Sequence, residues 1–321
     1  MKKTRIKESK NSLLIVLLAF AAFPLLMKTF VPNSNYVIQL GVFILIYSIA
    51  ASGLDILYGY CGQISMGHAG FFAIGAYGSA LLTDKLGIPI VFSALLACLI
   101  ATLVAAIIAF PASKLKFHFL SLATIAFGEI ILSLVQASPG EITGNFRGYF
   151  PAKIILFGLD FSSDYTLYFY LSLVILGIAL AAKLTITHSK TGRSFAAIRE
   201  NVVAAGGMGI DVRKYKVLAF SISAFYVAAA GALYGHFVNY ISPGLFSYNQ
   251  SVSFITMLLF GGSGSLWGPV VGVIAVQVMN ELLRSLEQYQ TLFYGVLMLI
   301  VILFMPNGLI NLKLGKRSKA R

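Results

Sequence analysis

The sequence contains few charged residues and few chemically reactive ones. Charged side chains make up 11% of the 321 residues, and there are two cysteines, Cys61 and Cys98, and four histidines. Both cysteines lie in apolar runs without metal-ligand spacing, which indicates small apolar fillers. The sequence also lacks a GxxxxGK[ST] phosphate loop, an HExxH pair and a GxSxG motif. These absences argue against an ATPase, a metalloprotease or a serine hydrolase. We therefore expect neither a metal site nor an enzymatic activity in this chain.

Long apolar runs fill most of the chain. Hydrophobic residues make up 58% of the sequence, and the mean hydropathy is +0.86. About 20 apolar helical residues cross the roughly 30 Å of bilayer hydrocarbon. The runs do not alternate as β-barrel strands do. We therefore expect an all-α membrane bundle of nine or ten spans or re-entrant helices in one domain, 1–321. The expected elements are 13–31, 36–57, 64–82, 88–110, 117–137, 165–182, 217–239 and 290–305, with a more complicated unit at 252–283.

Positive charge is concentrated in a few segments. The net charge is +13, and 19 of the 24 Lys and Arg residues lie in 1–10, 111–116, 183–216 and 313–321. Placing all four segments in the cytoplasm satisfies the positive-inside tendency. The charge excess therefore indicates topology, and no nucleic-acid partner is expected. Both termini are predicted to be cytoplasmic, with tails over 1–12 and 306–321, a cytoplasmic loop over 183–216 and an outer loop over 138–164.

The N-terminus allows two interpretations. Its basic start, its apolar run and the "AFA" at 19–21 also fit a signal peptide. We favour a retained first span, because a multi-span protein inserts without cleavage.

The unit 252–283 contains a helix break. The predicted topology requires this unit to begin and end outside, so it must turn back within the membrane. The stretch "FGGSGSLWGP" at 260–269 is rich in glycine and ends in proline. Irregular backbone at membrane depth is tolerated where protein or water covers it. We expect two short helical legs that meet at a break formed by Gly262, Gly264, Gly268 and Pro269.

The stretch "YGYCGQISMGHAGFFAIGAYGS" at 58–79 is unusual for a membrane helix. It carries many glycines, and Ala69, Ala73, Ala76 and Ala80 recur at helical spacing on one face. Small residues allow close backbone approach, which is a main source of helix adhesion in lipid. The third span is therefore predicted to pack closely against its neighbours, after a tight turn at 58–63.

Polar residues inside the spans are few and therefore informative. Asp55 is expected to reach the inner interface as a helix-end contact, and Gln63 and His68 are expected to form interhelical hydrogen bonds. Glu129 allows two interpretations. It is either an acid that packs between helices or a group that lines a substrate path. The candidate path consists of Gln63, Ser65, His68, Thr124 and Glu129.

The loop 183–216 is long for a connector. Phe195, Ile198 and Val202 form an apolar stripe, and "AGGMG" at 205–209 is predicted to stop the helix. Composition alone also fits a helix that lies on lipid headgroups.

Six stretches that follow one another along the chain have the character of sequence motifs. They are "GYCGQISMGHAGFFAIGAY" at 59–77, "TIAFGEI" at 124–130, "ITGNFRG" at 142–148, "GRSFAAIRENVVAAGGMGI" at 192–210, "YKVLAFSISAFYVAAAGALYG" at 215–235 and "FGGSGSLWGPVVG" at 260–272. Together they resemble the branched-chain amino-acid permeases of bacterial ABC importers, the LivH/LivM family. The second stretch is typical of the LivM branch.

The resemblance implies a role for the loop 192–210. In this family it would be the coupling helix, which docks into a groove on a separate ATP-binding subunit. Importer permeases share a pattern in which Glu-Ala-Ala is followed by three residues and then by Gly. Ala204, Ala205 and Gly209 match it, whereas Val203 stands where the acid would be. Arg199 or Glu200 would then supply the charged contact.

The resemblance also implies an assembly in the bacterial inner membrane. The chain would translocate leucine, isoleucine and valine together with a second, related permease, two ATP-binding subunits and an extracytoplasmic solute-binding protein that docks on 138–164. It would hold no cofactor, because the partner subunits bind ATP. A permease for urea, short amides or another small solute is an alternative, and an ion-coupled secondary carrier is a further one.

Overall fold

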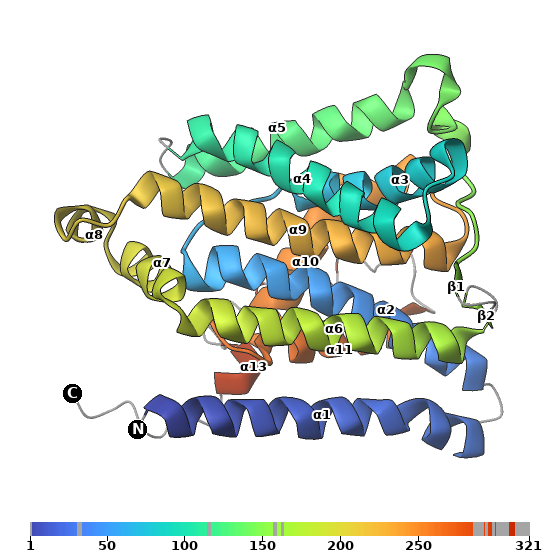
Figure 1. Ribbon diagram of the computed structural model, residues 1–321, viewed down its shortest axis with the longest axis horizontal. Helices are drawn as coiled ribbons and strands as arrows, with labels where there is room; N and C mark the ends of the chain where they lie inside the picture. The colour runs from blue at the N-terminus through green and yellow to red at the C-terminus, as the bar shows by residue number, and fades with distance from the viewer. Residues whose placement is uncertain are drawn as a thin grey trace.

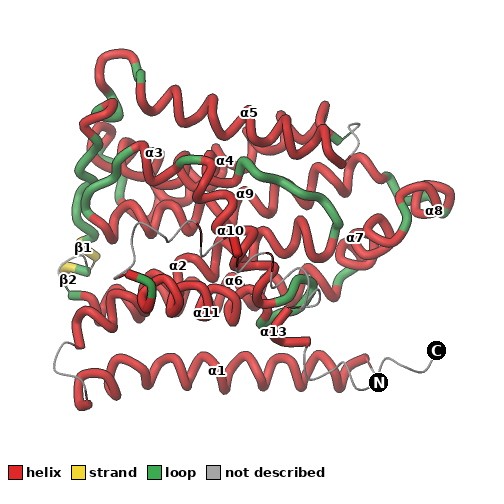
Figure 2. Tube along the Cα trace, turned by 180° about the vertical axis from the view of Figure 1, so that it is seen from behind, coloured by secondary structure: helices red, strands yellow, loops and turns green. Residues whose placement is uncertain are grey.

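A computed structural model describes residues 2–30, 34–113, 117–156, 159–161, 164–284, 292, 295–296, 299 and 308–311. Long helices lie side by side from α5 at one edge to α1 at the other, seen from the front and from behind (Figures 1 and 2). The helices are α1 (Lys2–Phe30), α2 (Ser34–Asp55), α3 (His68–Leu86), α4 (Ile90–Ala112), α5 (Phe117–Gln136), α6 (Tyr165–His188), α7 (Lys190–Glu200), α8 (Val202–Gly207), α9 (Val212–Val238), α10 (Tyr248–Gly261), α11 (Gly268–Leu282) and α13 (Gly308–Asn311).

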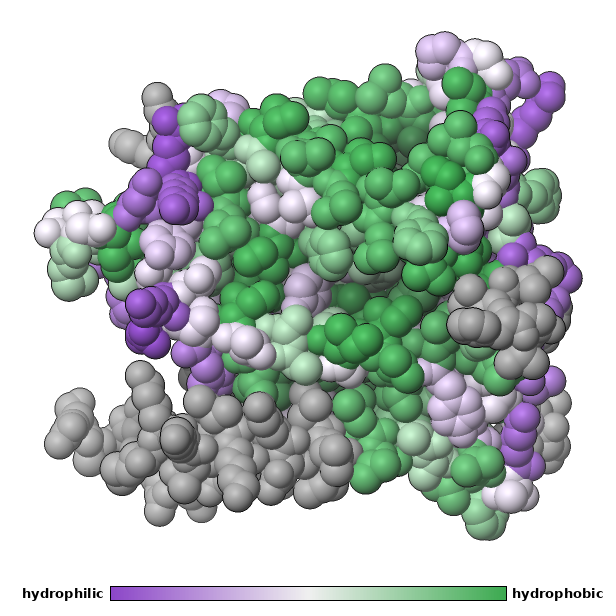
Figure 3. All heavy atoms as spheres, viewed as in Figure 1, coloured by the Kyte–Doolittle hydropathy of each residue, from purple (hydrophilic) through white to green (hydrophobic). Residues whose placement is uncertain are grey.

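The expected helical class is confirmed. Five described helical segments are long and apolar enough to cross a membrane: Ser34–Tyr60, Ile90–Ala112, Phe119–Gln136, Tyr165–His188 and Val212–Val238. Val16–Phe30 and Gly268–Leu282 are shorter apolar helices. Apolar side chains form a broad middle zone in Figure 3, and polar side chains gather at its two ends. The predicted span 290–305 lies almost entirely outside the described residues.

Several predicted boundaries are wrong. α1 begins at Lys2, so most of the expected tail 1–12 is helical, because Lys, Arg and Glu are good helix formers. α3 begins at His68 rather than at residue 64, after a non-helical segment that contains Gly62 at a φ of 72°. The predicted turn at 58–63 begins as a π-helix, Ile56–Tyr60, that continues α2. Among the described residues, β1 (Ile155–Leu156) and β2 (Leu159–Asp160) form a short hairpin of two strands with two residues each, which departs from the helical class.

The molecule has two ends, which we name the α7–α8 end and the hairpin end (Figure 1). At the α7–α8 end, Arg213 near the start of α9 donates to the carbonyl of Phe110 in the last turn of α4 at 3.3 Å. The first residues of α1 lie at the same end. The described parts of three of the basic segments, 1–10, 111–116 and 183–216, thus lie at the same end of the molecule.

At the hairpin end, the loop after α5 contacts the ends of α3 and α9. Tyr149 donates to the carboxylate of Asp84 at 2.8 Å, and His236 Nδ1 lies 3.0 Å from the carbonyl of Ala152. Burial and the Asp84 carboxylate raise the pKa of Tyr149 to about 12, so its phenol stays a hydrogen-bond donor. The ends of α3, α9 and this loop are therefore joined by polar contacts.

α3 packs closely against its neighbours α9 and α4, as its small residues predict. A methyl group on Gly75 would overlap the carbonyl of Ala228 in α9, and one on Gly231 would overlap the carbonyl of Phe72 in α3. A methyl group on Gly78 would lie 3.2 Å from the side chain of Ala97 in α4. Glycine is required at the α3–α9 contact because the two backbones touch.

We expect Gly75→Ala and Gly231→Ala to separate α3 from α9 and to cost about 1–3 kcal/mol of stability each. Thermal unfolding of the purified protein in detergent measures this loss. Gly244→Ala is the matched control, because nothing lies within 4 Å of the added methyl group. Equal midpoints for all three variants would contradict the close contact.

Candidate functional site

The α7–α8 hairpin is the first candidate site. Within α7, Phe195 and Ile198 of the predicted apolar stripe are buried, whereas Val202, its third member, lies in α8 and is exposed. The helix ends before Asn201, whose side-chain oxygen accepts from the backbone N–H groups of Val203 and Ala204 at 2.9 and 3.0 Å. The single helix predicted to stop at "AGGMG" is therefore wrong. Asn201 caps a second helix, α8, which satisfies N–H groups that a helix start leaves unpaired.

α8 protrudes from the bundle (Figure 1). Val203 is 84% exposed and Met208 is 71% exposed, whereas Ala205 is fully buried. Ala204 is also exposed. Gly209 has a φ of 81°, which favours glycine, and nothing lies within 4 Å of a methyl group added there. The tip of the hairpin is thus an apolar surface that the described part of the chain does not cover.

The two charged residues predicted for coupling differ in their surroundings. Arg199 Nη1 donates to the carbonyl of Gly59, and a methyl group on Gly264 would lie 3.2 Å from the same nitrogen. Glu200 is exposed. Arg199 therefore links α7 to the rest of the chain, while Glu200 remains on the surface.

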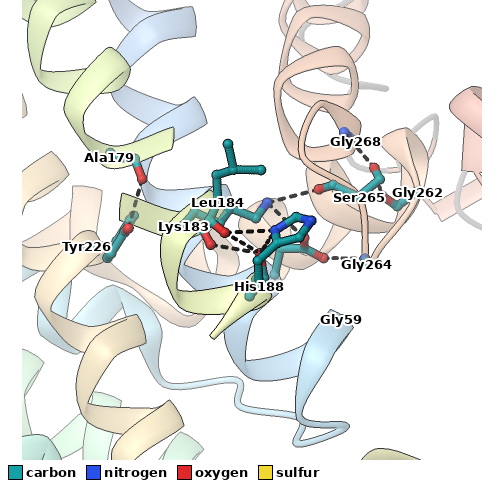
Figure 4. Close-up of polar contacts among 12 residues, drawn as sticks. Gly59, Ala179, Lys183, Leu184, His188, Tyr226, Gly262, Gly264, Ser265 and Gly268 are labelled. Atoms are coloured by element: carbon teal, nitrogen blue, oxygen red, sulfur yellow. Dashed lines mark hydrogen bonds and ion pairs between the residues drawn. The ribbon is translucent and has the colours of Figure 1, made fainter. Parts of the chain in front are cut away.

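A buried polar cluster, which we name the polar junction, lies beside Gly59. Its ion pair joins Asp55 at the end of α2 to Lys183 in α6, with 2.8 Å between carboxylate oxygen and ammonium nitrogen and both side chains 0% exposed. The backbone N–H of Gly264 donates to Asp55 at 2.6 Å, and Lys183 donates to the carbonyl of Ser265 at 3.0 Å. Figure 4 shows Lys183 reaching from α6 toward Ser265.

The structure changes the setting of both residues. α6 continues to His188, so the loop expected from residue 183 begins later and Lys183 is buried. Asp55 ends α2 and makes a helix-end contact, as the sequence predicts, but this contact is buried. One signal could have found the pair: each is a single charge at the end of an apolar run, and the signs are opposite.

The predicted helix break lies at the polar junction. α10 ends at Gly261 and α11 begins at Gly268, followed by Pro269, so the break itself covers 262–267. Gly262 and Gly264 have φ values of 104° and 77°, which side chains rarely adopt. The Ser265 hydroxyl accepts from the N–H of Gly268 at 2.9 Å. The break is therefore ordered by local bonds and by the contacts to Asp55 and Lys183.

The non-helical segment 61–67 gathers most of the candidate path residues. Gln63 donates to the carbonyl of Lys216 at 3.1 Å, and Thr124 Oγ1 accepts from the N–H of Met66 at 3.0 Å. His68 lies between the hydroxyls of Ser65 and Ser223, at 2.7 and 2.8 Å. These side chains are buried and join the segment to α5 and α9, in line with the predicted interhelical hydrogen bonds.

Glu129 is not part of this cluster. It lies on an exposed face of α5, together with Ile130, Ser133 and Leu134. Its carboxylate therefore does not pack against the interior of this chain. No group of three His, Cys, Asp or Glu side chains that could hold a metal ion occurs among the described residues.

Residues 36–305 match a family model described as "Branched-chain amino acid transport system / permease component". The chain is 30% identical over 300 residues to the high-affinity branched-chain amino acid transport system permease protein LivM of Escherichia coli K12, which covers 86% of this chain and 70% of that protein. It is 26% identical over 292 residues to a probable LivM permease of Methanocaldococcus jannaschii, with 83% of each covered. It is 24% identical over 281 residues to LivH of E. coli K12, with 83% of this chain and 91% of that protein covered.

We expect Asn201→Ala to weaken α8 by about 1 kcal/mol, because it removes the acceptor for two backbone N–H groups. Hydrogen exchange at residues 203–204 should then be about fivefold faster. Asn201→Asp keeps an acceptor and serves as the control. Unchanged exchange in Asn201→Ala would show that the cap does not hold α8.

Proposed function

The chain belongs to the branched-chain amino acid transport permease family, and we propose that it is a membrane subunit of an ABC importer for leucine, isoleucine and valine. Its relatives are transport permeases and not enzymes. The substrate class is taken from the names of the relatives. The proposed location is the bacterial inner membrane, with nine or ten spans in one domain over 1–321.

The observation that carries this proposal is the α7–α8 hairpin. It presents an exposed apolar tip at the end where basic segments gather. Exposed apolar surface on a protruding element is a typical protein–protein contact. We assign this tip to a groove on an ATP-binding subunit, with Ala204, Gly209 and Glu200 on the contact side and Arg199 and Ala205 holding the hairpin to the bundle.

We propose one orientation for the remaining segments and partners. With the α7–α8 end assigned to the cytoplasm, the tails 1–12 and 306–321 and the loop 183–216 are proposed to be cytoplasmic. The segment 138–164 is outside and receives a solute-binding protein. Two ATP-binding subunits drive the cycle, and no cofactor is held by this chain.

Glu129 supports a second, related permease. An acid at membrane depth is costly where it faces lipid, so such residues face protein or water. Its exposed position on α5 therefore suits a surface that a second permease covers or that lines the path between the two. Gln63, Ser65, His68 and Thr124 border this region through the contact of segment 61–67 with α5.

Reconstituted vesicles test the proposed function. The wild-type chain, assembled with a second permease, two ATP-binding subunits and a solute-binding protein, should take up leucine only with ATP inside the vesicle. Uptake by this chain alone, lost when the ion gradient is collapsed, would instead identify a secondary carrier. ATP-driven uptake of urea or short amides but not of leucine would identify a different substrate.

We expect Ala204→Glu to abolish uptake, because a bulky charge would occupy the apolar docking surface. Co-purification of the ATP-binding subunits and their ATP hydrolysis measure the docking directly. Ala137→Glu makes the same change at an exposed position near the hairpin end and is the control. Normal co-purification with Ala204→Glu would refute the docking assignment.

We expect Glu129→Gln to lower the rate of uptake about tenfold if the carboxylate lines the path. Ser133→Ala, one turn further along the same face, is the control. Initial rates of leucine uptake in the vesicles measure the effect. A wild-type rate in Glu129→Gln would leave the acid as a contact between permeases without a role in transport.

A further inference from the structure

The Asp55–Lys183 ion pair is an unusual way to join two membrane helices. Removing both charges from water carries a penalty that their mutual attraction offsets only with good geometry and further hydrogen bonds. Apolar residues of similar volume would pack α2 against α6 without that penalty. Here the further bonds are present, and both go to the backbone of the break.

These two bonds join the break to α2 and α6. Gly264 donates to Asp55, and Ser265 accepts from Lys183, so one charged side chain from each helix holds one residue of the break. Gly262 and Gly264 have positive φ, and the N–H of Gly262 still bonds to the carbonyl of Leu258 in α10 at 3.1 Å. The break is therefore fixed to α10 by its own backbone, and to α2 and α6 by the ion pair.

Helix α7 reaches the polar junction by two routes. α6 ends at His188 and α7 begins at Lys190, so a movement of α7 displaces the last turns of α6, where Lys183 lies. Arg199 of α7 also donates to Gly59, in the turn that follows Asp55. A methyl group on Gly59 would overlap the Asp55 carboxylate, so this turn and the ion pair are in direct contact.

We propose that Asp55 and Lys183 are positioning residues for transport, and that their ion pair carries the movement of α7 to the glycine break at 262–267. This role rests on the proposed function, because an ATP-binding subunit must move α7. When α7 shifts, the ends of α6 and α2 shift together, and the ion pair pulls Gly264 and Ser265 with them. The two legs α10 and α11 then change position with each nucleotide cycle.

The test uses the complete importer in vesicles and measures solute molecules transported per ATP hydrolysed. Asp55→Asn/Lys183→Met removes both charges and leaves no buried charge uncompensated. We expect this variant to reach the membrane with normal thermal stability and to hydrolyse ATP, with its transport per ATP about tenfold lower. Lys183→Arg keeps the cation and should retain most of the coupling.

A matched control removes another ion pair. Glu281 and Arg284 lie 3.7 Å apart at the end of α11 and are partly exposed, so Glu281→Gln/Arg284→Met should leave transport per ATP unchanged. If Asp55→Asn/Lys183→Met transports as many solute molecules per ATP as the wild type, the proposal is overturned and the pair serves helix packing only. A role in packing alone would not lower transport per ATP while leaving thermal stability normal.

A second variant keeps both charges if the double variant does not assemble. Gly59→Ala pushes on the Asp55 carboxylate and on the N–H of Gly264 that bonds to it, and should also lower transport per ATP, whereas Gly244→Ala adds a methyl group in open space. A wild-type ratio in Gly59→Ala would then overturn the proposal. ATP-independent uptake by the wild-type importer would instead refute the proposed function, so the two failures are distinguishable.

Discussion

The structure depends on one constraint, which is that backbone polar groups inside a bilayer must be satisfied by the protein itself. Two of the non-helical segments that the structure describes, 61–67 and 262–267, lie against buried polar side chains. Serine, threonine, histidine and glutamine side chains support the first segment. An ion pair supports the second. Buried polar side chains are therefore present where these two segments interrupt the helices.

This arrangement connects local chemistry to transport. Close packing of α3 against α9 makes the middle of the bundle rigid, because their backbones touch and leave little room to slide. The irregular segments are held by a small number of directional bonds. Arg199 of the α7–α8 hairpin bonds to Gly59, which precedes segment 61–67, and a methyl group on Gly264 would lie 3.2 Å from the same side chain. The proposed docking surface and the helix break are thus separated by a short chain of contacts.

Much of the fold could be predicted because hydrophobic length is a local property. The apolar runs located the helices α2, α4, α5 and α9 to within a few residues, and the glycine spacing predicted the close packing of α3. The glycines at 205–209 predict the wrong helix end, because α7 already ends at Glu200 and the side chain of Asn201 caps the next helix. Helix propensity is a weak prior, and a specific cap overrides it.

The helical class, the break in 252–283 and, through the motifs, the family follow from the amino-acid sequence, because they depend on neighbouring residues and on composition. The buried pairing of Asp55 with Lys183, the outward face of Glu129 and the bond of Arg199 to Gly59 are visible only in the folded chain. These facts depend on which helices lie side by side. Hydropathy does not specify neighbours, because every apolar helix face is equally compatible with lipid and with another apolar helix.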